Sequence, residues 1–512
     1  MLLNDTSFFL NEGERVGIIG INGTGKSTLL RIIAGEEEED EGRISRARHV
    51  VVRYLPQTPV FDPEHTVLES VLAQAGEGVS EADAKTMLTK LGIFNFDQPA
   101  GELSGGQRKR LALTAVLLSS CDILVLDEPT NHLDSEMSAW LEERLKSFNG
   151  ALVMVTHDRY FLDSVCTRIV ELDKGKLYSY DTNYSGFLKL KAEREASLQA
   201  SERKRQSILR KEIEWMMRGA RARSTKQKAH IQRYEALRDM KAPETDGRVE
   251  MSSVYTRMGR TTVELLDISK SYGDRTLIKD FTYRFLKNDR IGFIGPNGCG
   301  KTTLMKMIVG MEQPDSGEIV IGQTVKPGYY TQEIANDPSA GIAYMNPNDR
   351  VIDYIRNTAE YVRTADGTMT ASAMLELFLF PGEQQYSPIS KLSGGEKRRL
   401  NLLRVLMEAP NVLILDEPTN DLDIATLQIL EDYLDSYQGI VITVSHDRYF
   451  LDRVVGRIFA FEGNGRLRQH EGGYTDYENR LKAEREAAGI DGEPAGSISM
   501  GKDKSAGKQS VK

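Results

Sequence analysis

The sequence has few cysteines and no long apolar run. Cys121, Cys166 and Cys299 are the three cysteines in 512 residues, and none lies in a CxxC pair or at zinc-ligand spacing from a histidine. This spacing excludes a disulfide framework and a structural zinc site. No stretch approaches the roughly 18 apolar residues of a membrane helix, and the N-terminus lacks the basic start of a signal peptide. We therefore expect a cytoplasmic protein that does not enter the membrane.

Acidic and basic residues are distributed unevenly along the chain. The net charge is -9, yet residues 189–241 hold 16 lysines and arginines against seven acidic residues. Lysine and arginine gain affinity for nucleic acids by releasing counterions from phosphates. The segment therefore predicts a polyanionic partner, whereas the rest of the chain is acidic and is expected to repel one.

The chain repeats itself over a long period. DEPTN begins at Asp127 and again at Asp416, and HDRYFLD begins at His157 and again at His446, in both cases 289 residues later. The pattern GxxxxGK[ST] recurs after 275 residues, at 20–27 and 295–302. Two homologous modules therefore follow each other, and the second carries 14 extra residues between Gln332 and Ser393.

Each module predicts an α/β fold. Short apolar strands, such as Arg15–Ile19 and Ala151–Val155, alternate with amphipathic helices, which is typical of a buried and largely parallel sheet. Between the modules the chain is rich in Glu, Lys, Arg and Ala, which predicts two long helices packed as a basic hairpin. The expected division is residues 1–186, a linker at 187–256, residues 257–478, and the start of a helix with a disordered tail at 479–512.

The glycine-rich sequences GINGTGKS and GPNGCGKT predict two sites for a polyphosphate. Glycines let the backbone N–H groups wrap the phosphates, and the following helix N-terminus adds a favourable dipole. Lys26 and Lys301 are expected to reach the terminal phosphates, while Ser27 and Thr302 are expected to hold Mg²⁺. The further residues expected to bind nucleotide here are Gly20, Asn22, Gly23, Gly25, Thr28, Gly295, Asn297, Gly298, Gly300 and Thr303.

Acidic residues and a histidine follow the apolar strands in both modules. Asp127 and Asp416 are expected to orient Mg²⁺, and the adjacent Glu128 and Glu417 are candidate general bases for attack of water on a phosphate. Taken alone, such a pair is more often a helix cap, and a lone histidine is usually structural. Recurrence at the same spacing favours catalysis, so the candidate histidines that contact the terminal phosphate are His157 and His446.

The sequences LSGGQ and LSGGE each place a serine and two glycines at the start of a helix. Such an N-terminus binds anions, and the glycines permit a close approach. A serine cap alone explains the serine but not the glycine pair. The residues concerned are Ser104, Gly105, Gly106, Ser393, Gly394 and Gly395.

Together these motifs resemble those of ATP-binding-cassette ATPases, and two cassettes joined by a basic linker resemble the ABC-F family. The linker text EWMMRGARARSTKQKAHIQRYEAL is similar to that of Uup-like members. The resemblance implies Mg²⁺-dependent ATP hydrolysis at two composite sites, in which the phosphate loop of one cassette faces the LSGG motif of the other. It also implies that Gln57 and Gln332 bind nucleotide and metal, and that Tyr272 stacks on adenine.

The first module departs from the family pattern. Tyr272 lies 29 residues before Lys301, but the same distance before Lys26 falls ahead of Met1. We therefore expect module one to lack its first strand and the adenine-stacking aromatic, and the natural start to lie upstream. The insertion that some members carry between Gln57 and Ser104 is absent, as is the C-terminal coiled coil tied to DNA binding in Uup.

The resemblance also implies a partner. In the family the linker approaches tRNA on the ribosome, and its expected contacts here are Arg218, Arg221, Arg223, Lys226 and Lys228. Two other functions stay open: a DNA-binding or DNA-repair accessory ATPase using the same basic hairpin, and the ATP-binding subunit of a transporter. In each case we expect a monomer whose two cassettes pair with each other.

Overall fold

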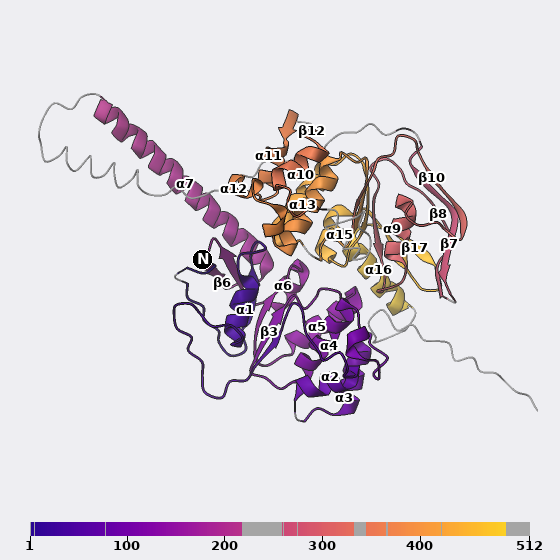
Figure 1. Cartoon of the computed structure of the whole chain (residues 1–512), viewed down its shortest axis with the longest axis horizontal. Coiled ribbons are helices and arrows are strands. Elements are labelled where there is room, and N and C mark those ends of the chain that lie inside the picture. Colours follow the sequence, from indigo (N-terminus) through magenta and orange to yellow (C-terminus); the bar gives the residue numbers. More distant parts are fainter. Residues whose placement is uncertain are drawn as a thin grey trace, which may run out of the picture.

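The computed structural model describes residues 2–4, 6–76, 78–217, 259, 261–273, 275–331, 345–364, 367–420 and 422–487. In these ranges the chain forms two α/β bodies, one for each module, and a long helix that projects away from the first (Figure 1). The second helix of the expected hairpin, its basic tip and the C-terminal tail lie outside the described residues.

Module one begins with a strand that leads into the first glycine loop. Its elements are β1 Arg15–Ile19, α1 Lys26–Ala34, β2 Val52–Leu55, α2 Val67–Ala75, α3 Glu81–Lys90, η1 Ala100–Glu102, α4 Gly105–Leu118, β3 Ile123–Asp127, α5 Ser135–Lys146, β4 Ala151–Val155, α6 Arg159–Val165, β5 Arg168–Asp173, β6 Lys176–Tyr180 and α7 Tyr184–Met217.

Module two repeats this order and adds further strands. Its elements are β7 Val263–Tyr272, β8 Arg275–Arg284, β9 Arg290–Ile294, α9 Lys301–Val309, β10 Ser316–Ile321, β11 Pro327–Tyr330, α10 Val351–Thr358, β12 Tyr361–Thr364, β13 Gly367–Thr370, α11 Ala371–Leu377, α12 Gly382–Gln385, η3 Ile389–Lys391, α13 Gly394–Met407, β14 Val412–Asp416, α14 Ile424–Ser436, β15 Ile440–Val444, α15 Arg448–Val454, β16 Arg457–Phe461, β17 Leu467–Glu471 and α16 Tyr474–Ala487.

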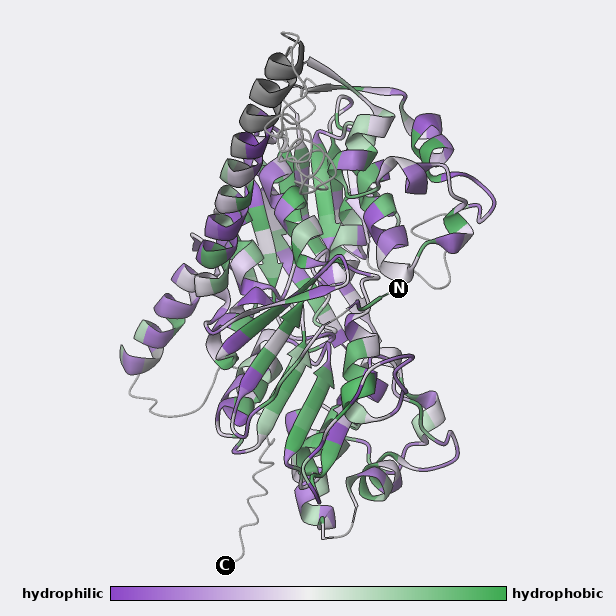
Figure 2. Ribbon diagram, turned by 90° about the vertical axis from the view of Figure 1, so that its left-hand side faces the viewer, coloured by the Kyte–Doolittle hydropathy of each residue, from purple (hydrophilic) through white to green (hydrophobic). Residues whose placement is uncertain are grey.

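The two main sheets have the same topology. Their strand orders are β2-β3-β4-β1-β5-β6 and β11-β14-β15-β9-β16-β17, and only the last pair of each is antiparallel. Parallel strands are buried on both faces, so they read as continuous apolar runs, which Figure 2 shows as predominantly hydrophobic ribbons. The carboxyl ends of β1, β3 and β4 consequently meet at one edge, where the phosphate loop and the acidic residues follow.

The modules differ where the sequence predicted a difference. In module two a three-stranded antiparallel sheet, β10-β7-β8, packs Leu265, Ile278 and Phe281 onto the core of the main sheet. No counterpart of this sheet occurs among the described residues of module one. The stretch that carries the extra residues of module two includes the hairpin of β12 and β13.

Two helix starts differ from the expected boundaries. The linker helix α7 begins at Tyr184 rather than at 187, because Tyr184 and Phe187 are both buried against module one. The last helix, α16, begins at Tyr474 rather than at 479, and Tyr474 is likewise buried. Tyr184 and Tyr474 therefore each hold the base of their helix to the preceding cassette.

The described helices include none that is apolar over enough residues to span a bilayer. The longest, α7, is rich in charged side chains along its length. The helix that projects from module one is therefore polar.

Candidate functional site: two nucleotide-binding sites between the modules

The phosphate loops have the geometry that the sequence predicts. Gly25 and Gly300 precede α1 and α9 with φ of 102° and 112°, in the left-handed region that favours glycine. No side chain caps either helix, so the first N–H groups point into the loop. The ammonium of Lys26 donates to the carbonyls of Gly20 at 2.7 Å and Ile21 at 3.0 Å, which holds it inside the loop.

The second loop repeats this arrangement and adds a histidine. The ammonium of Lys301 donates to the carbonyl of Gly295 at 2.7 Å and lies 3.3 Å from Nε2 of His446. Thr28 and Thr303 lie in the first turns of α1 and α9, directly after the residues expected to hold Mg²⁺. Both loops therefore present N–H groups and an ammonium to the same space.

The aspartates at the ends of β3 and β14 have the properties of a magnesium site. Each lies beside the expected hydroxyl, Asp127 beside that of Ser27 and Asp416 beside that of Thr302. Burial raises the pKa of both carboxyls. Oδ2 of Asp127 and Oδ1 of Asp416 are buried without a hydrogen-bond partner among the described residues. Because Mg²⁺ prefers hard oxygen ligands, these residues fit the ion.

A tyrosine beside each aspartate is a site residue that the motif search missed. The hydroxyl of Tyr329 donates to Oδ2 of Asp416 at 3.4 Å, and Tyr54 contacts Asp127 in the same way. Burial and the neighbouring aspartate raise the pKa of both hydroxyls, so they remain donors. The repeat itself held the signal, since Tyr54 and Tyr329 each lie 28 residues after the loop lysine.

The candidate bases are held in an unusual backbone conformation. Glu128 and Glu417 have φ of 51° and 50°, which is uncommon for a side chain of this size. Oε1 of Glu128 lies 3.2 Å from Nε2 of His157, and Oε1 of Glu417 lies 3.4 Å from Nε2 of His446. The predicted base and histidine are therefore neighbours in both modules.

Burial sets the protonation of these pairs. It raises the pKa of Glu128 to about 8, with help from Asp127, and that of Glu417 to about 7. Burial and the loop lysines lower the pKa of His157 to about 3 and that of His446 well below its ordinary range. The imidazoles are thus neutral, and each glutamate is a stronger base than an exposed carboxylate once it has lost its proton.

The LSGG serines serve their own helices. Ser104 and Ser393 cap α4 and α13 by accepting from the N–H groups of Gln107 and Glu396, both at 3.3 Å. This is the helix cap that the sequence left open as the plainer explanation. The glycines have a separate role. A Cβ atom at Gly395 would lie 2.5 Å from the side-chain amide nitrogen of Asn22. Gly395 therefore permits the close approach of the first phosphate loop.

The two modules face each other head to tail. The N–H of Asn22 donates to Oδ2 of Asp423 at 2.9 Å, so the first loop contacts the segment before α14 of module two. In the other direction Asn297 donates to the carbonyl of His132 at 3.2 Å, and His132 packs against Gly106. Each phosphate loop thus lies against the opposite module, as the composite sites require, although the two contacts differ in their atoms.

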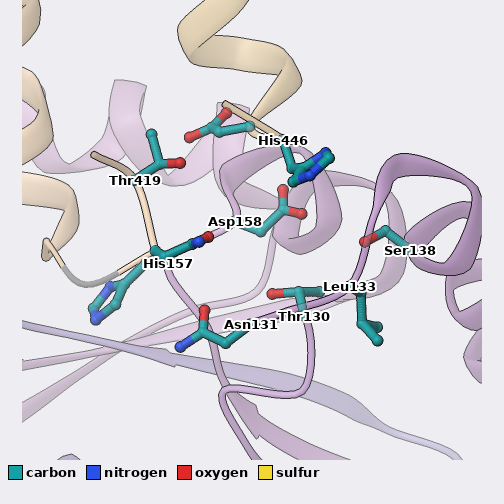
Figure 3. Close-up of a pocket in the computed structure, with 10 residues that line it drawn as sticks. Thr130, Asn131, Leu133, Ser138, His157, Asp158, Thr419 and His446 are labelled. Atoms are coloured by element: carbon teal, nitrogen blue, oxygen red, sulfur yellow. The ribbon is translucent and has the colours of Figure 1, made fainter. Parts of the chain in front are cut away.

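A cavity of about 30 Å³ lies between the two modules (Figure 3). Figure 3 shows Asp158 between the side chains of His157 and His446. A volume of this size has room for about one water. The residues that line it come from both modules: Thr130, Asn131, Leu133, Ser138, His157, Asp158, Thr419, Asn420, His446 and Asp447.

Arg159 and the acidic residues that bind it join the modules beside this cavity. The sequence motifs did not indicate this cluster. Arg159 is buried and donates to Oε2 of Glu431 at 3.0 Å and to Oδ2 of Asp447 at 3.3 Å. Its guanidinium also lies 4.2 Å from the ring centre of Tyr449. HDRYFLD was recognised only as a repeat, because no pattern in sequence links Arg159 to a glutamate 272 residues away.

For some residues that the sequence assigned to the sites, the structure shows contacts with other protein groups. Others lie outside the described residues. Tyr272 ends β7 with its ring half exposed and its hydroxyl bonded to Glu312, and the ammonium of Lys270 lies 5.5 Å from the ring centre. Gln57 accepts through its carbonyl from Lys109. Gln332 and the five expected linker contacts lie outside the described residues.

The sequence profile of the ABC transporter family matches residues 3–131 and 278–420, and a second profile of that family, an extension, matches 170–252. The chain is 48% identical to the uncharacterized ABC transporter ATP-binding protein YfmR of Bacillus subtilis, covering 95% of this chain and 82% of that protein. It is 37% identical to the energy-dependent translational throttle protein EttA of Escherichia coli, covering 94% and 93%. The chain belongs to the ABC-F family of tandem-cassette ATPases.

Solved structures agree with this fold. A complex of archaeal ribosomal stalk protein aP1 with the ribosome recycling factor aABCE1 matches with a TM-score of 0.61 at 22% identity, covering 93% of this chain and 89% of that one. Ribosome-bound archaeal ABCE1 matches with a TM-score of 0.62 at 21% identity, covering 93% and 77%. Module one and module two therefore have the fold of ABC cassettes. The match to the ABC family profile and to EttA makes the enzyme an ATPase.

Proposed function

We propose that this ABC-F ATPase is a translation factor that binds the ribosome when ATP holds its two cassettes together. The observation that carries the proposal is the contact of Asn22 with Asp423 and Gly395, which supports a first ATP site built from both cassettes. The relatives support the partner, because EttA is named a translational throttle protein. The basic segment at 189–241 supplies the charge that RNA requires.

The residues of each cassette divide the chemistry among them. Lys26 and Lys301 hold the terminal phosphates, and Glu128 and Glu417 accept the proton of the attacking water. The neutral imidazoles of His157 and His446 fix these carboxylates in place through the contacts described above. Asp127, Asp416, Ser27, Thr302 and the two glutamines would hold Mg²⁺, which neutralises charge on the phosphates when it is bound.

Closure of the two cassettes links ATP binding to ribosome binding. Nucleotide contacts both cassettes only when they meet, so ATP favours the closed arrangement over an open one by its differential affinity. The helix α7 is fixed to cassette one and projects away from its body (Figure 1). Hydrolysis removes the extra affinity and releases the ribosome. Both halves of the interface belong to one chain, which supports action as a monomer.

The test is ribosome binding by a variant that closes but does not hydrolyse ATP. In the double variant Glu128→Gln, Glu417→Gln the bases are lost while both phosphate loops remain. We expect this variant to sediment with ribosomes in ATP and to be released in ADP. Equal sedimentation with and without ATP would contradict the proposal.

The control replaces the five basic residues of the linker tip in the same double variant. We expect Arg218→Gln, Arg221→Gln, Arg223→Gln, Lys226→Gln and Lys228→Gln together to weaken ribosome binding and to reduce its salt dependence. Branched DNA serves as the competing ligand. Tighter ATP-dependent binding to DNA than to ribosomes would favour the DNA-repair function instead.

A further inference from the structure

Lys109 is a buried lysine that the catalytic description does not use. It lies on α4, and the residue is only 4% exposed. Its ammonium donates to the carbonyls of Pro56 at 2.6 Å, Gln57 at 3.3 Å and Asp127 at 2.6 Å. The three ammonium protons are thereby matched by three backbone acceptors. Burying a cation costs free energy. Because three backbone carbonyls satisfy this ammonium, the contacts indicate that the cassette requires a cation at this position.

These three acceptors lie at the first ATP site. Gln57 follows β2 as a predicted ligand of that site, and Asp127 ends β3 one residue before the candidate base Glu128. Strands β2 and β3 are neighbours, with Leu55 opposite Leu126. Lys109 therefore fixes the ends of two adjacent strands, and with them the metal-binding and catalytic side of site one.

The helix that carries Lys109 belongs to the other site. The N-terminus of α4 is formed by Ser104, Gly105 and Gly106, and His132, which packs against Gly106, accepts from Asn297 of the second phosphate loop at 3.2 Å. Lys109 is five residues further along the same helix. One ammonium thus connects an element of site two to two elements of site one, within a single rigid cassette.

We propose that Lys109 is a positioning residue that couples the two ATP sites. When ATP at site two draws α4 toward the second phosphate loop, Lys109 moves Gln57 and Asp127 with it and aligns Glu128 at site one. This inference rests on the composite sites of the proposed function, but not on the ribosome. At the matching place in cassette two the residue is Arg398, a planar cation that does not present three donors from one atom.

The experiment measures hydrolysis at site one with site two either filled or unable to bind. Glu417→Gln leaves ATP bound at site two without hydrolysis, whereas Lys301→Ala prevents its binding. The ratio of the two site-one kcat values reports the coupling. We expect this ratio to be well above one in the parent chain and to fall by about tenfold, toward one, when Lys109→Met is added. A tenfold change corresponds to about 1.4 kcal/mol.

A lysine that only stabilised the fold would lower both rates equally and leave the ratio unchanged, which would overturn the proposal. A parent ratio of one would overturn it as well. If Lys109→Met does not fold, Lys109→Arg takes its place because it keeps the charge. We expect Lys109→Arg to restore the ratio in part. The matched control is Lys85→Met on α3, where an exposed lysine pairs with Glu81 at 3.2 Å, and it is expected to leave the ratio as in the parent. Because ribosomes are absent from the assay, failure of the ribosome hypothesis leaves this result intact.

Discussion

Glu128 and Glu417 adopt a left-handed backbone conformation in both cassettes, although neither is a glycine. Such a conformation costs on the order of 1–3 kcal/mol and persists only where the surroundings enforce it. Here the N–H of each glutamate donates at 2.8 Å to the strand that precedes the histidine, at Val155 and Val444. The strained turn directs the carboxylate away from the sheet and toward the imidazole, which is the orientation that a general base requires.

Asp158 is expected to make stability depend on pH. Burial and the facing Asp447 raise the pKa of its carboxyl from 3.8 to about 7. Between these values the folded chain keeps a proton that the unfolded chain has lost, so the free energy of unfolding falls as pH rises from about 4 to about 7. We expect Asp158→Asn to raise the melting temperature by a few degrees at pH 8 and by little at pH 4.

Asparagine can still cap α6, which Asp158 does by accepting from the N–H of Phe161 at 2.9 Å. Differential scanning calorimetry at several pH values measures the effect. The control is the exposed Asp97→Asn, whose melting temperature should follow that of the parent at every pH. A constant difference between Asp158→Asn and the parent would contradict the assignment.

At the scale of elements, the base of α7 is held by a buried carboxylate. Glu171 on β5 is 5% exposed, and it accepts from Lys191 at 2.6 Å and from Arg194 at 2.9 Å. Arg194 also lies 4.1 Å from the ring centre of Tyr178. The corresponding position in cassette two is Ala460, so α16 has no such carboxylate beneath it. The linker helix is therefore held by a carboxylate that α16 lacks at the matching position, whereas α16 binds β17 through Glu484 and Arg468.

We expect Glu171→Gln to loosen α7 without unfolding cassette one. Charge-assisted hydrogen bonds to a buried group contribute about 1.5–3 kcal/mol, so amide exchange in the first turns of α7 should accelerate by about tenfold or more. Hydrogen exchange measured by mass spectrometry reports this directly. Glu195→Gln is the control, because Glu195 is half exposed and lies 3.9 Å from Lys191. Equal exchange in both variants would show that Glu171 does not anchor the helix.

At the scale of the whole molecule, the interface between cassettes is symmetric in sequence but not in its charges. Arg448 corresponds to Arg159, yet it contacts Tyr160, Tyr474 and the carbonyl of Ser135 rather than a carboxylate. Its potential partner Glu142 is bound instead by Lys146 at 2.7 Å, on the same helix. Position 435 is an aspartate where cassette one has Lys146, and Glu431 binds Arg159 across the interface as well as Arg453 of its own cassette at 2.8 Å.

We expect Arg159→Met to weaken the closed arrangement far more than Arg448→Met. Removing one partner of a buried ion pair costs about 3–5 kcal/mol, and Arg453, which also binds Glu431 at 2.8 Å, offsets part of that cost. Small-angle scattering without nucleotide should show a larger radius of gyration for Arg159→Met, and saturating ATP should reduce it. Addition of Glu431→Gln should recover part of the loss. Indistinguishable scattering of the two arginine variants would contradict the predicted asymmetry.

Much of each ATP site could be predicted because its parts are local in sequence. The turn from β1 into α1 is set by glycines and a lysine within eight residues, and the acidic pair directly follows its strand. Repetition at 275 and 289 residues then singled out the candidate catalytic residues. Helix starts were placed less well, since the burial of Tyr184 and Tyr474 decides where α7 and α16 begin.

The sequence by itself determined the two α/β cassettes, their phosphate loops and the positions of the candidate bases, because strand periodicity, turn chemistry and motif spacing are properties of neighbouring residues. Only the tertiary structure decided that Arg159 binds Glu431, that Lys109 binds three carbonyls and that Asn22 meets Asp423. These contacts join residues far apart in the chain, and several of them end on backbone atoms that every residue possesses. Such an acceptor leaves no mark in a sequence, so its partner becomes visible only once the chain has folded.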